Sequence, residues 1–331
     1  MSPAPTGAAP ALGEFDVIAR YFTRPARTAG LGVGDDCALI AAPPGLTLAI
    51  TTDMLLEGRH FLRAADPYRL GHKALAVNLS DLAAMGADPR WFTLAIALPV
   101  VDAGWLERFA AGLFALADAQ RIELVGGDTT RGPLTLSITA IGTLPTGYAL
   151  RRDGAAPGDD VWLSGATGEA ALALAALHGE VALDDGATAA CQERLDAPVP
   201  RIALGRKLRR LASAAIDVSD GLAADLGHIL ERSQVGAEVW LDALPRAPAL
   251  AACADAALAQ RCLLAGGDDY ELLFTAPAER RRDVLAAGEA AVVPVTRIGR
   301  IVPGDALVVR DASGAAVPLA ARGFDHFASG S

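Results

Sequence analysis

The chain of 331 residues lacks several features that would assign it to a class at once. No apolar run approaches the ~20 residues that a helix needs to cross a bilayer, so no membrane association is expected. Residues 1–13 contain no basic segment followed by an apolar core. We therefore expect no signal peptide, and we predict that this Ala- and Pro-rich start is a disordered lead.

Basic residues are in deficit. Lys and Arg total 29 against 39 Asp and Glu, which gives a net charge of −10. The chain therefore has no broad basic surface for nucleic acid. An anionic partner would have to be held locally, by metal ions or by a few well-placed arginines, and this condition suits a small phosphorylated ligand better than a polymer.

Paired cysteines and the common nucleotide motifs are also missing. Four cysteines are scattered without a Cys-x-x-Cys spacing, which favours a protein of the reducing cytoplasm. The sequence contains no Gly-x-x-x-x-Gly-Lys-Ser/Thr loop and no set of protein-kinase motifs. It contains neither a Gly-x-Ser-x-Gly elbow nor a His-Glu-x-x-His pair. These absences leave metal chemistry with oxygen ligands as the main possibility.

What the sequence does contain is a set of aspartates beside Gly, Ser or Thr, at the ends of strand-like runs. They lie in the motifs Gly34-Asp35-Asp36, Thr51-Thr52-Asp53, Asn78-Leu79-Ser80-Asp81, Gly126-Gly127-Asp128, Asp217-Val218-Ser219-Asp220 and Gly266-Gly267-Asp268-Asp269. Carboxylates at strand ends gather at the rim of a sheet, where α/β proteins build their sites. Because like charges repel one another there, the cluster implies cations, and hard oxygen ligands select Mg²⁺ or Ca²⁺.

The composition, 52% hydrophobic and 21% charged, is that of a globular protein long enough for two domains. We predict an amino-terminal domain over residues 14–148 and a carboxyl-terminal domain over residues 149–331, joined by a turn-rich stretch near residues 151–160. The spacing of apolar residues predicts both helices and strands in the first half of the chain. Helices are predicted over residues 14–22, 67–85 and 105–117, with Phe109 and Phe114 in the core, and strands over residues 46–50, 91–98, 122–125 and 134–144.

The helix over residues 67–85 has clear limits and carries an unusual charge. Asp66-Pro67 is typical of a helix start, and Gly86 followed by Pro89 of a helix end. Asp81 falls on the same face as apolar residues, where a carboxylate is costly unless it is paired or bound to metal. In the alternative interpretation the helix is apolar nearly all round and Asp81 only reaches solvent.

The second half opens with a strand at residues 161–163, a glycine loop at residues 164–168 and an alanine-rich helix. This arrangement suits phosphate binding at a helix start, but many structural turns have the same pattern. A short strand over residues 214–218 is followed by a helix to about residue 231, which we expect Ser219 or Asp220 to cap. Residues 292–301 and 306–319 are predicted as closing strands, with a turn at residues 311–314.

Taken together, these motifs closely resemble the thiamine-phosphate kinase family over residues 13–328. The resemblance rests on the order and spacing of Gly34-Asp35-Asp36-Cys37-Ala38, Thr51-Thr52-Asp53, the stretch from Lys73 to Ala87, Gly126-Gly127-Asp128-Thr129-Thr130, Asp217-Val218-Ser219-Asp220-Gly221-Leu222 and Gly323-Phe324-Asp325-His326-Phe327. Each motif is short, but the set is highly specific.

The resemblance implies an α/β (α+β) protein with a two-domain aminoimidazole ribonucleotide synthetase-like fold, in which helices flank mixed sheets. Members of this superfamily are typically homodimers that bind nucleotide between their domains. The implied reaction is the Mg²⁺-dependent, direct transfer of a phosphoryl group from ATP to thiamine monophosphate, giving ADP and thiamine diphosphate.

The resemblance also implies roles for individual residues. The metal ligands would be Asp36, Asp53, Asp81, Asp128, Asp217 and Asp220, assisted by Thr51 and Thr52, with Asp128 and Asp220 as the candidate catalytic residues. Nucleotide would contact Gly127, Asp128, Arg152 and Ser219. Thiamine phosphate would contact His60, Asp268 and Phe324. Asp268 departs from the family pattern, which more often has Glu at this position. From the residues alone, His60 could equally be a surface hydrogen-bonding group and Phe324 a core residue.

The chemistry of the acceptor agrees with this assignment. A phosphate monoester has a second pKa of about 6, so the nucleophile is largely ionised at neutral pH and needs no general base. The barrier is then the repulsion between two anions, which Mg²⁺ on several aspartates would reduce. Arg152 would add a forked donor for phosphate oxygens.

Two alternatives remain. The chain could be another ATP-using enzyme of the same superfamily with a different small-molecule acceptor. A selenophosphate synthetase would be expected to carry an early reactive cysteine, and no cysteine precedes Cys37. A non-catalytic calcium module would be expected to have a compact Asp-x-Asp-x-Asp-Gly loop, whereas these aspartates are spread over more than two hundred residues.

Overall fold

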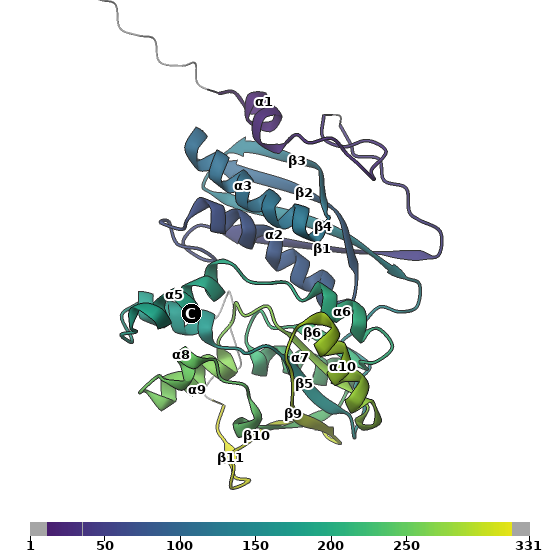
Figure 1. Cartoon of the computed structure of the whole chain (residues 1–331), viewed down its shortest axis with the longest axis vertical. Coiled ribbons are helices and arrows are strands. Elements are labelled where there is room, and N and C mark those ends of the chain that lie inside the picture. The colour runs from purple at the N-terminus through teal and green to yellow at the C-terminus, as the bar shows by residue number, and fades with distance from the viewer. Residues whose placement is uncertain (1–11, 35, 320–331) are drawn as a thin grey trace, which may run out of the picture. The chain divides into compact units, whose positions relative to one another are not determined.

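The computed structural model describes residues 12–34 and 36–319, and their contacts divide the chain into two units (Figure 1). The first unit comprises the described residues up to Ala41, Thr52–Ala74 and Trp91–Thr139. The second comprises Ala42–Thr51, Leu75–Arg90 and the described residues from Ala140 onward. Since these limits cut through a helix and several strands, a domain boundary at residues 148–149 stays a prediction. Most of the predicted disordered lead, residues 1–11, lies outside the described residues.

A four-stranded mixed sheet is formed in the order β1-β4-β2-β3. Its strands are β1 (Leu46–Leu56), β2 (Asp88–Leu98), β3 (Glu123–Arg131) and β4 (Thr135–Pro145). β2 and β3 run parallel, with a register shift between Phe92 and Thr93. Helices α2 (Pro67–Ala84) and α3 (Ala103–Gln120) run over this sheet in Figure 1.

A seven-stranded mixed sheet is formed in the order β11-β10-β7-β9-β5-β8-β6. Its strands are β5 (Asp160–Ser164), β6 (Ala214–Asp217), β7 (Gly236–Trp240), β8 (Leu272–Ala276), β9 (Val295–Val302), β10 (Leu307–Arg310) and β11 (Ala316–Val317). β10 pairs with β7 in parallel, and the other pairs are antiparallel. The predicted closing segments are confirmed: residues 292–301 contain most of β9, and residues 306–319 contain the antiparallel pair β10 and β11, which the predicted turn at residues 311–314 connects.

The remaining helices are mostly short. They are α1 (Glu14–Val17), a π-helix (Ile18–Phe22), α4 (Glu169–Leu177), α5 (Asp185–Asp196), α6 (Ile202–Leu208), α7 (Leu222–Ser233), α8 (Pro248–Ala251), α9 (Ala256–Ala265), α10 (Arg281–Ala291) and the 3-10 turns Leu241–Ala243 and Ala278–Arg280. Among the described residues, no helix is both long and apolar enough to cross a membrane.

Local signals placed the long helices correctly. Asp66 Oδ1 accepts a hydrogen bond from the Arg69 amide at 3.1 Å, and α2 is followed by Gly86 with φ +67°. In α3 the predicted core face is confirmed, because Phe109 and Phe114 are 0% and 5% exposed. Trp105 stacks on Phe109 with ring centroids 5.0 Å apart, which fixes this face of the helix against the core.

The prediction that the aspartate motifs stand at strand ends is wrong for the motifs of Asp53, Asp81 and Asp128, and Asp81 lies within α2. Asp53 lies inside β1 and Asp128 inside β3, because both strands continue past the motif. In β3 the pairing with β2 runs on from Asp128 to Arg131, so the neighbouring strand rather than the local sequence decides where β3 stops. Asp217 does stand at a strand end, as the last residue of β6.

Candidate active site

In β1, alternation of side chains separates the residues of the Thr51-Thr52-Asp53 motif. Thr51 and Asp53 are half-buried on one face, whereas Thr52 is exposed on the other, where its hydroxyl lies 2.8 Å from that of Thr139. The side chains of Thr51 and Asp53 can therefore serve one site. Thr52 can reach that site only through its backbone.

Asp128 is carried by a strand that lies unusually close to its neighbour. A Cβ atom at Gly127 would stand 1.9 Å from the Leu94 carbonyl oxygen, so only glycine fits at this position. Asp128 follows in register with Ala95 of β2 and is exposed. Gly127 thus allows β2 and β3 to approach closely next to Asp128.

Two further predicted residues of the first unit lie in loops. Asp36 is exposed, directly after the undescribed residue 35. His60 is half-buried, and its Nδ1 accepts a hydrogen bond from the Leu56 amide at 3.1 Å. This bond makes Nδ1 an acceptor and fixes the orientation of the imidazole ring.

Asp81 and Thr51 meet in the second unit. The Thr51 hydroxyl donates a hydrogen bond to Asp81 Oδ2. Burial raises the pKa of Asp81, and the Thr51 hydrogen bond and the Arg152 charge offset this only in part. The alternative in which Asp81 merely reaches solvent does not fit this environment. An incompletely compensated carboxylate favours a nearby cation.

The segment after β6 is arranged around a carboxylate that sequence analysis missed. Asp225, on α7 and only 2% exposed, accepts hydrogen bonds from the amides of Ser219 and Asp220, both at 3.0 Å. Burial, together with the charge of Asp220, raises the pKa of Asp225 to about 7 despite these two bonds. The expected cap by Ser219 or Asp220 is wrong, since Gly221 is the N-cap residue. Asp225 lies on the apolar face of α7 with Leu222 and Leu226, and that pattern could have revealed it.

Arg152 interacts electrostatically with both Asp81 and Asp225. It is exposed, and its charge lowers the pKa of both Asp81 and Asp225. Within the second unit, the structure therefore brings one predicted arginine into electrostatic range of the Thr51–Asp81 pair and of the carboxylate that holds Ser219 and Asp220. Asp217, 4% exposed, ends the strand that leads into this segment.

Asp268 lies in the loop between α9 and β8, next to the same segment. Its amide donates to the Ser219 carbonyl at 2.9 Å, and the Tyr270 amide donates to the Val218 carbonyl at 2.8 Å. The Tyr270 hydroxyl donates to Asp268 Oδ1 at 2.9 Å. The predicted substrate-binding aspartate and the predicted nucleotide-binding Ser219 are thus neighbours. Phe324 lies outside the described residues.

The glycine loop at residues 164–168 leads into α4, and the amide at the start of this helix is hydrogen-bonded within the protein. Both carboxylate oxygens of Asp269 accept the Gly168 amide, each at 2.9 Å. Asp269 is 5% exposed, and burial raises its pKa well above the ordinary range. This amide is already satisfied by protein, so the structural interpretation of the loop is favoured over phosphate binding. Asp269 belongs to one of the aspartate motifs but was given no role, and Glu271, which is also buried, was not identified from the sequence.

The donors available for Mg²⁺ are hard carboxylate and hydroxyl oxygens, which fit that ion. Thr51 and Asp81 supply such a pair, and burial leaves the Asp81 carboxylate in need of positive charge. Among the described residues, no three His, Cys, Asp or Glu side chains gather as a metal site. The six-aspartate ligand set therefore stays a prediction.

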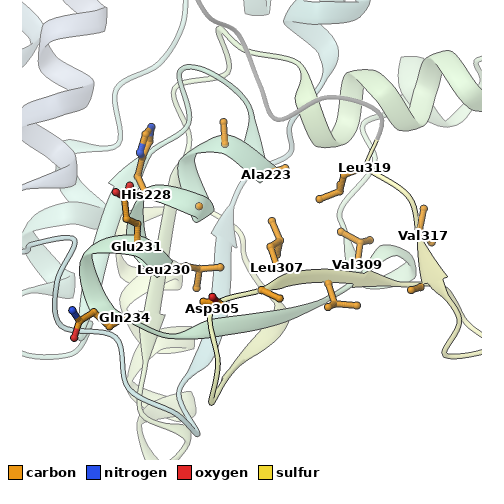
Figure 2. Close-up of a pocket in the computed structure, with 15 residues that line it drawn as sticks. Ala223, His228, Leu230, Glu231, Gln234, Asp305, Leu307, Val309, Val317 and Leu319 are labelled. Atoms are coloured by element: carbon orange, nitrogen blue, oxygen red, sulfur yellow. The ribbon is translucent and has the colours of Figure 1, made fainter.

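One pocket of about 980 Å³ lies in the second unit, between α7 and the strands β10 and β11 (Figure 2). Leu230, Leu307 and Val309 are among its apolar lining residues, and Glu231 and Asp305 also line it. None of the predicted site residues lines it.

Family models match both halves of the chain. The model of the AIR synthase related protein N-terminal domain matches residues 34–144, and that of the C-terminal domain matches residues 156–312. A thiamine-monophosphate kinase of Salmonella typhimurium is 49% identical over 327 residues, which cover 96% of this chain and 99% of that protein. The chain belongs to the thiamine-monophosphate kinase family. The implied fold, two AIR synthase-like domains with mixed sheets and flanking helices, is confirmed.

Solved structures agree with the family. A thiamine-monophosphate kinase from Stenotrophomonas maltophilia K279a is 47% identical, with a TM-score of 0.82 over 91% of this chain and 95% of that one. AaThiL complexed with AMPPCP and TMP is 31% identical, with a TM-score of 0.75 over 87% of this chain and 89% of that one. The AaThiL structure thus holds an ATP analogue and TMP on the same fold.

Proposed function

We propose that this protein transfers the γ-phosphoryl group of ATP to thiamine monophosphate, forming ADP and thiamine diphosphate. The observation that carries the proposal is the complex of AaThiL with AMPPCP and TMP, a donor analogue and an acceptor on a fold that this chain shares over most of its length. Two relatives named thiamine-monophosphate kinase, 47% and 49% identical, match over 96% of this chain and 99% of their own length.

In this proposal the residues of the protein bind and position the reacting phosphates. The acceptor phosphate is ionised at neutral pH, so the protein has no proton to remove from it. Arg152 would bind phosphate oxygens with its forked guanidinium, and the Asp225 carboxylate holds the amides of Ser219 and Asp220 in place beside it. His60, Asp268 and Phe324 are proposed to hold thiamine phosphate, and Gly127, Asp128 and Ser219 the nucleotide.

Mg²⁺ is proposed as the resident cation. Asp36, Asp53, Asp81, Asp128, Asp217 and Asp220 would hold it, with the oxygens of Thr51 and Thr52. When bound, Mg²⁺ neutralises charge on the phosphates that react. The environment of Asp81 supports this role, because the Thr51 hydroxyl and the Arg152 charge offset the effect of burial only in part and a bound cation would stabilise the ionised carboxylate.

A homodimer is proposed from the exposed face of β1, an edge strand of its sheet. Leu48, Ile50, Met54 and Leu56 alternate along this face and are 38%, 65%, 54% and 40% exposed. A long apolar edge strand is a template for pairing with another chain, so a second copy would cover it. The four free cysteines support a cytoplasmic location, where thiols stay reduced.

Substitution of Asp128 tests the metal and nucleotide assignment. Asp128→Asn removes a negative charge with little change in volume, so we expect the fold to persist and kcat to fall about 100-fold at saturating Mg²⁺. Asp242→Asn, an exposed aspartate of the 3-10 turn Leu241–Ala243, is the matched control and should leave kcat unchanged. Full activity of Asp128→Asn would overturn the ligand assignment.

A different acceptor is the second outcome to be tested. If the protein binds ATP with Mg²⁺ but forms no thiamine diphosphate, it is an ATP-using member of the superfamily with another acceptor. Screening phosphorylated metabolites for ADP release would then identify it.

A further inference from the structure

The loop between α9 and β8, residues 266–271, is held in an unfavourable backbone conformation. Asp268 and Tyr270 have φ values of +65° and +52°, in the left-handed region that residues other than glycine rarely adopt. Such a conformation persists only where the surroundings determine it. The loop also presents Asp268, the residue proposed to contact thiamine phosphate.

A buried ionic cluster stands at the end of this loop. Glu271 is 0% exposed, and its carboxylate accepts hydrogen bonds from Ser164 Oγ at 2.6 Å, from an Arg194 NH group at 2.6 Å and from Arg201 Nε at 2.7 Å. A second nitrogen of Arg201 donates to the other carboxylate oxygen, which makes this pair bidentate. We call Ser164, Arg194, Arg201 and Glu271 the Glu271 cluster.

The cluster joins elements that are far apart in the sequence. Arg194 comes from α5, Arg201 is the N-cap residue of α6, and Ser164 ends β5. Ser164 Oγ also accepts the Leu272 amide at 2.8 Å, so it fixes the start of β8 as well. A Cβ atom at Gly165 would lie 2.2 Å from Glu271 Oε1, which shows how closely the glycine loop is fitted around the carboxylate.

The two sides of the candidate site are held by different carboxylates. Asp225 holds the amides of Ser219 and Asp220 on the nucleotide side. Asp269 and Glu271 hold the loop that carries Asp268, through Gly168 and through the two arginines. Loss of the Glu271 cluster should therefore loosen one side of the site and leave the amides held by Asp225 in place.

We propose that Arg201 and Arg194, acting through Glu271, are positioning residues that set the affinity for thiamine phosphate by fixing the conformation of loop 266–271. This inference rests on the proposed function, because it takes Asp268 as the substrate contact. None of the three residues needs to touch substrate, and their effect reaches it through the backbone between Asp268 and Glu271.

Arg201→Lys is the direct test, because it keeps the positive charge and removes the forked geometry. We expect the KM for thiamine monophosphate to rise by on the order of tenfold, because one charge-assisted hydrogen bond is lost. The KM for ATP should stay unchanged. Arg206→Lys is the matched control. Arg206 lies on the same helix, is 55% exposed and pairs with Asp88, so this variant should leave both KM values unchanged.

Hydrogen exchange gives a readout that does not depend on activity. In Arg201→Lys, peptides over residues 266–272 should exchange faster than in the wild type, while peptides over α7 should not change. Ser164→Ala is a second variant, which keeps both arginines and removes one donor to Glu271 together with the acceptor of the Leu272 amide, so residues 266–271 are the segment to compare. It should produce the same pattern with smaller changes, even if Arg201→Lys does not fold.

Unchanged exchange of residues 266–272 in a folded variant would overturn the positioning role, and so would an equal rise of both KM values with a general loss of stability. Asp268→Asn separates this failure from that of the proposed function. If Asp268→Asn leaves the KM for thiamine monophosphate unchanged while exchange responds to Arg201→Lys, Asp268 is not the substrate contact and the link from the cluster to substrate affinity fails with it.

Discussion

At the scale of single residues, the buried carboxylates differ in what satisfies them. Asp225 and Asp269 accept backbone amides, and Glu271 accepts two arginines and a serine. The half-buried Asp81 accepts the Thr51 hydroxyl and is also stabilised by the charge of Arg152. Full pairing fixes a structural carboxylate, whereas a partly paired carboxylate keeps capacity for another ligand. Asp81 is therefore the aspartate whose environment fits metal binding best.

Glu123, at the start of β3, gives a pH-dependent prediction. Burial acts to raise its pKa, but the amides of Arg27 and Thr28 and the charge of Arg27 outweigh burial, and the pKa lies below its usual value of 4.5. A lowered pKa adds stability above the unfolded value, and this stability is lost as the pH falls through the folded value.

We expect Glu123→Gln to lower the free energy of unfolding by about 1–2 kcal/mol at pH 7. The gap to the wild type should start to narrow as the pH falls below 4.5, where the unfolded state takes up a proton first, and it should close below the lower folded pKa, where the native carboxyl is protonated too. Denaturant unfolding of both proteins between pH 7 and pH 3 measures this gap. A gap that is constant with pH would show that the charge of Glu123 does not stabilise the fold.

At the scale of elements, local signals predicted helices better than the limits of strands. Asp66, Pro67 and Gly86 mark the ends of α2 within the sequence itself, and the helix forms between them. The ends of β1 and β3 depend on neighbouring strands, which the local sequence does not show. This is why Asp53 and Asp128 were expected at strand ends and lie inside strands.

The buried partners were missed for a related reason. Glu271 is satisfied by arginines 70 and 77 residues away along the chain, and Asp269 by an amide 101 residues away. The local sequence marks Asp269 only as part of an aspartate motif, and it shows neither its buried partner nor those of Glu271. The motif set nevertheless identified the family, because order and spacing along the whole chain do not require knowledge of contacts.

Gly127 gives a prediction for β3. Gly127→Ala would place a Cβ atom 1.9 Å from the Leu94 carbonyl oxygen, so β2 and β3 must separate, and we expect a loss of about 3 kcal/mol or more in stability. Gly227→Ala is the control, because nothing lies within 4 Å of its added Cβ in α7 and alanine favours helix by about 1 kcal/mol. Thermal unfolding compares the two, and equal melting temperatures would contradict the close approach of β2 and β3.

At the scale of the whole molecule, the apolar face of β1 leads to the prediction of a dimer. We expect Ile50→Glu to convert dimers to monomers, since it places a charge on the face that a second copy would cover. Val100→Glu, at a residue of similar exposure beyond the end of β2, is the control and should leave the dimer intact. Sedimentation velocity distinguishes the species, and a wild-type protein that is monomeric at working concentration would refute the dimer.

The central claim concerns the reaction, and product analysis tests it most directly. Purified protein should be incubated with ATP, Mg²⁺ and thiamine monophosphate, and the products separated by chromatography with mass detection. The account predicts equimolar thiamine diphosphate and ADP, and neither when Mg²⁺ is removed. ADP without thiamine diphosphate, or no turnover under these conditions, would contradict it.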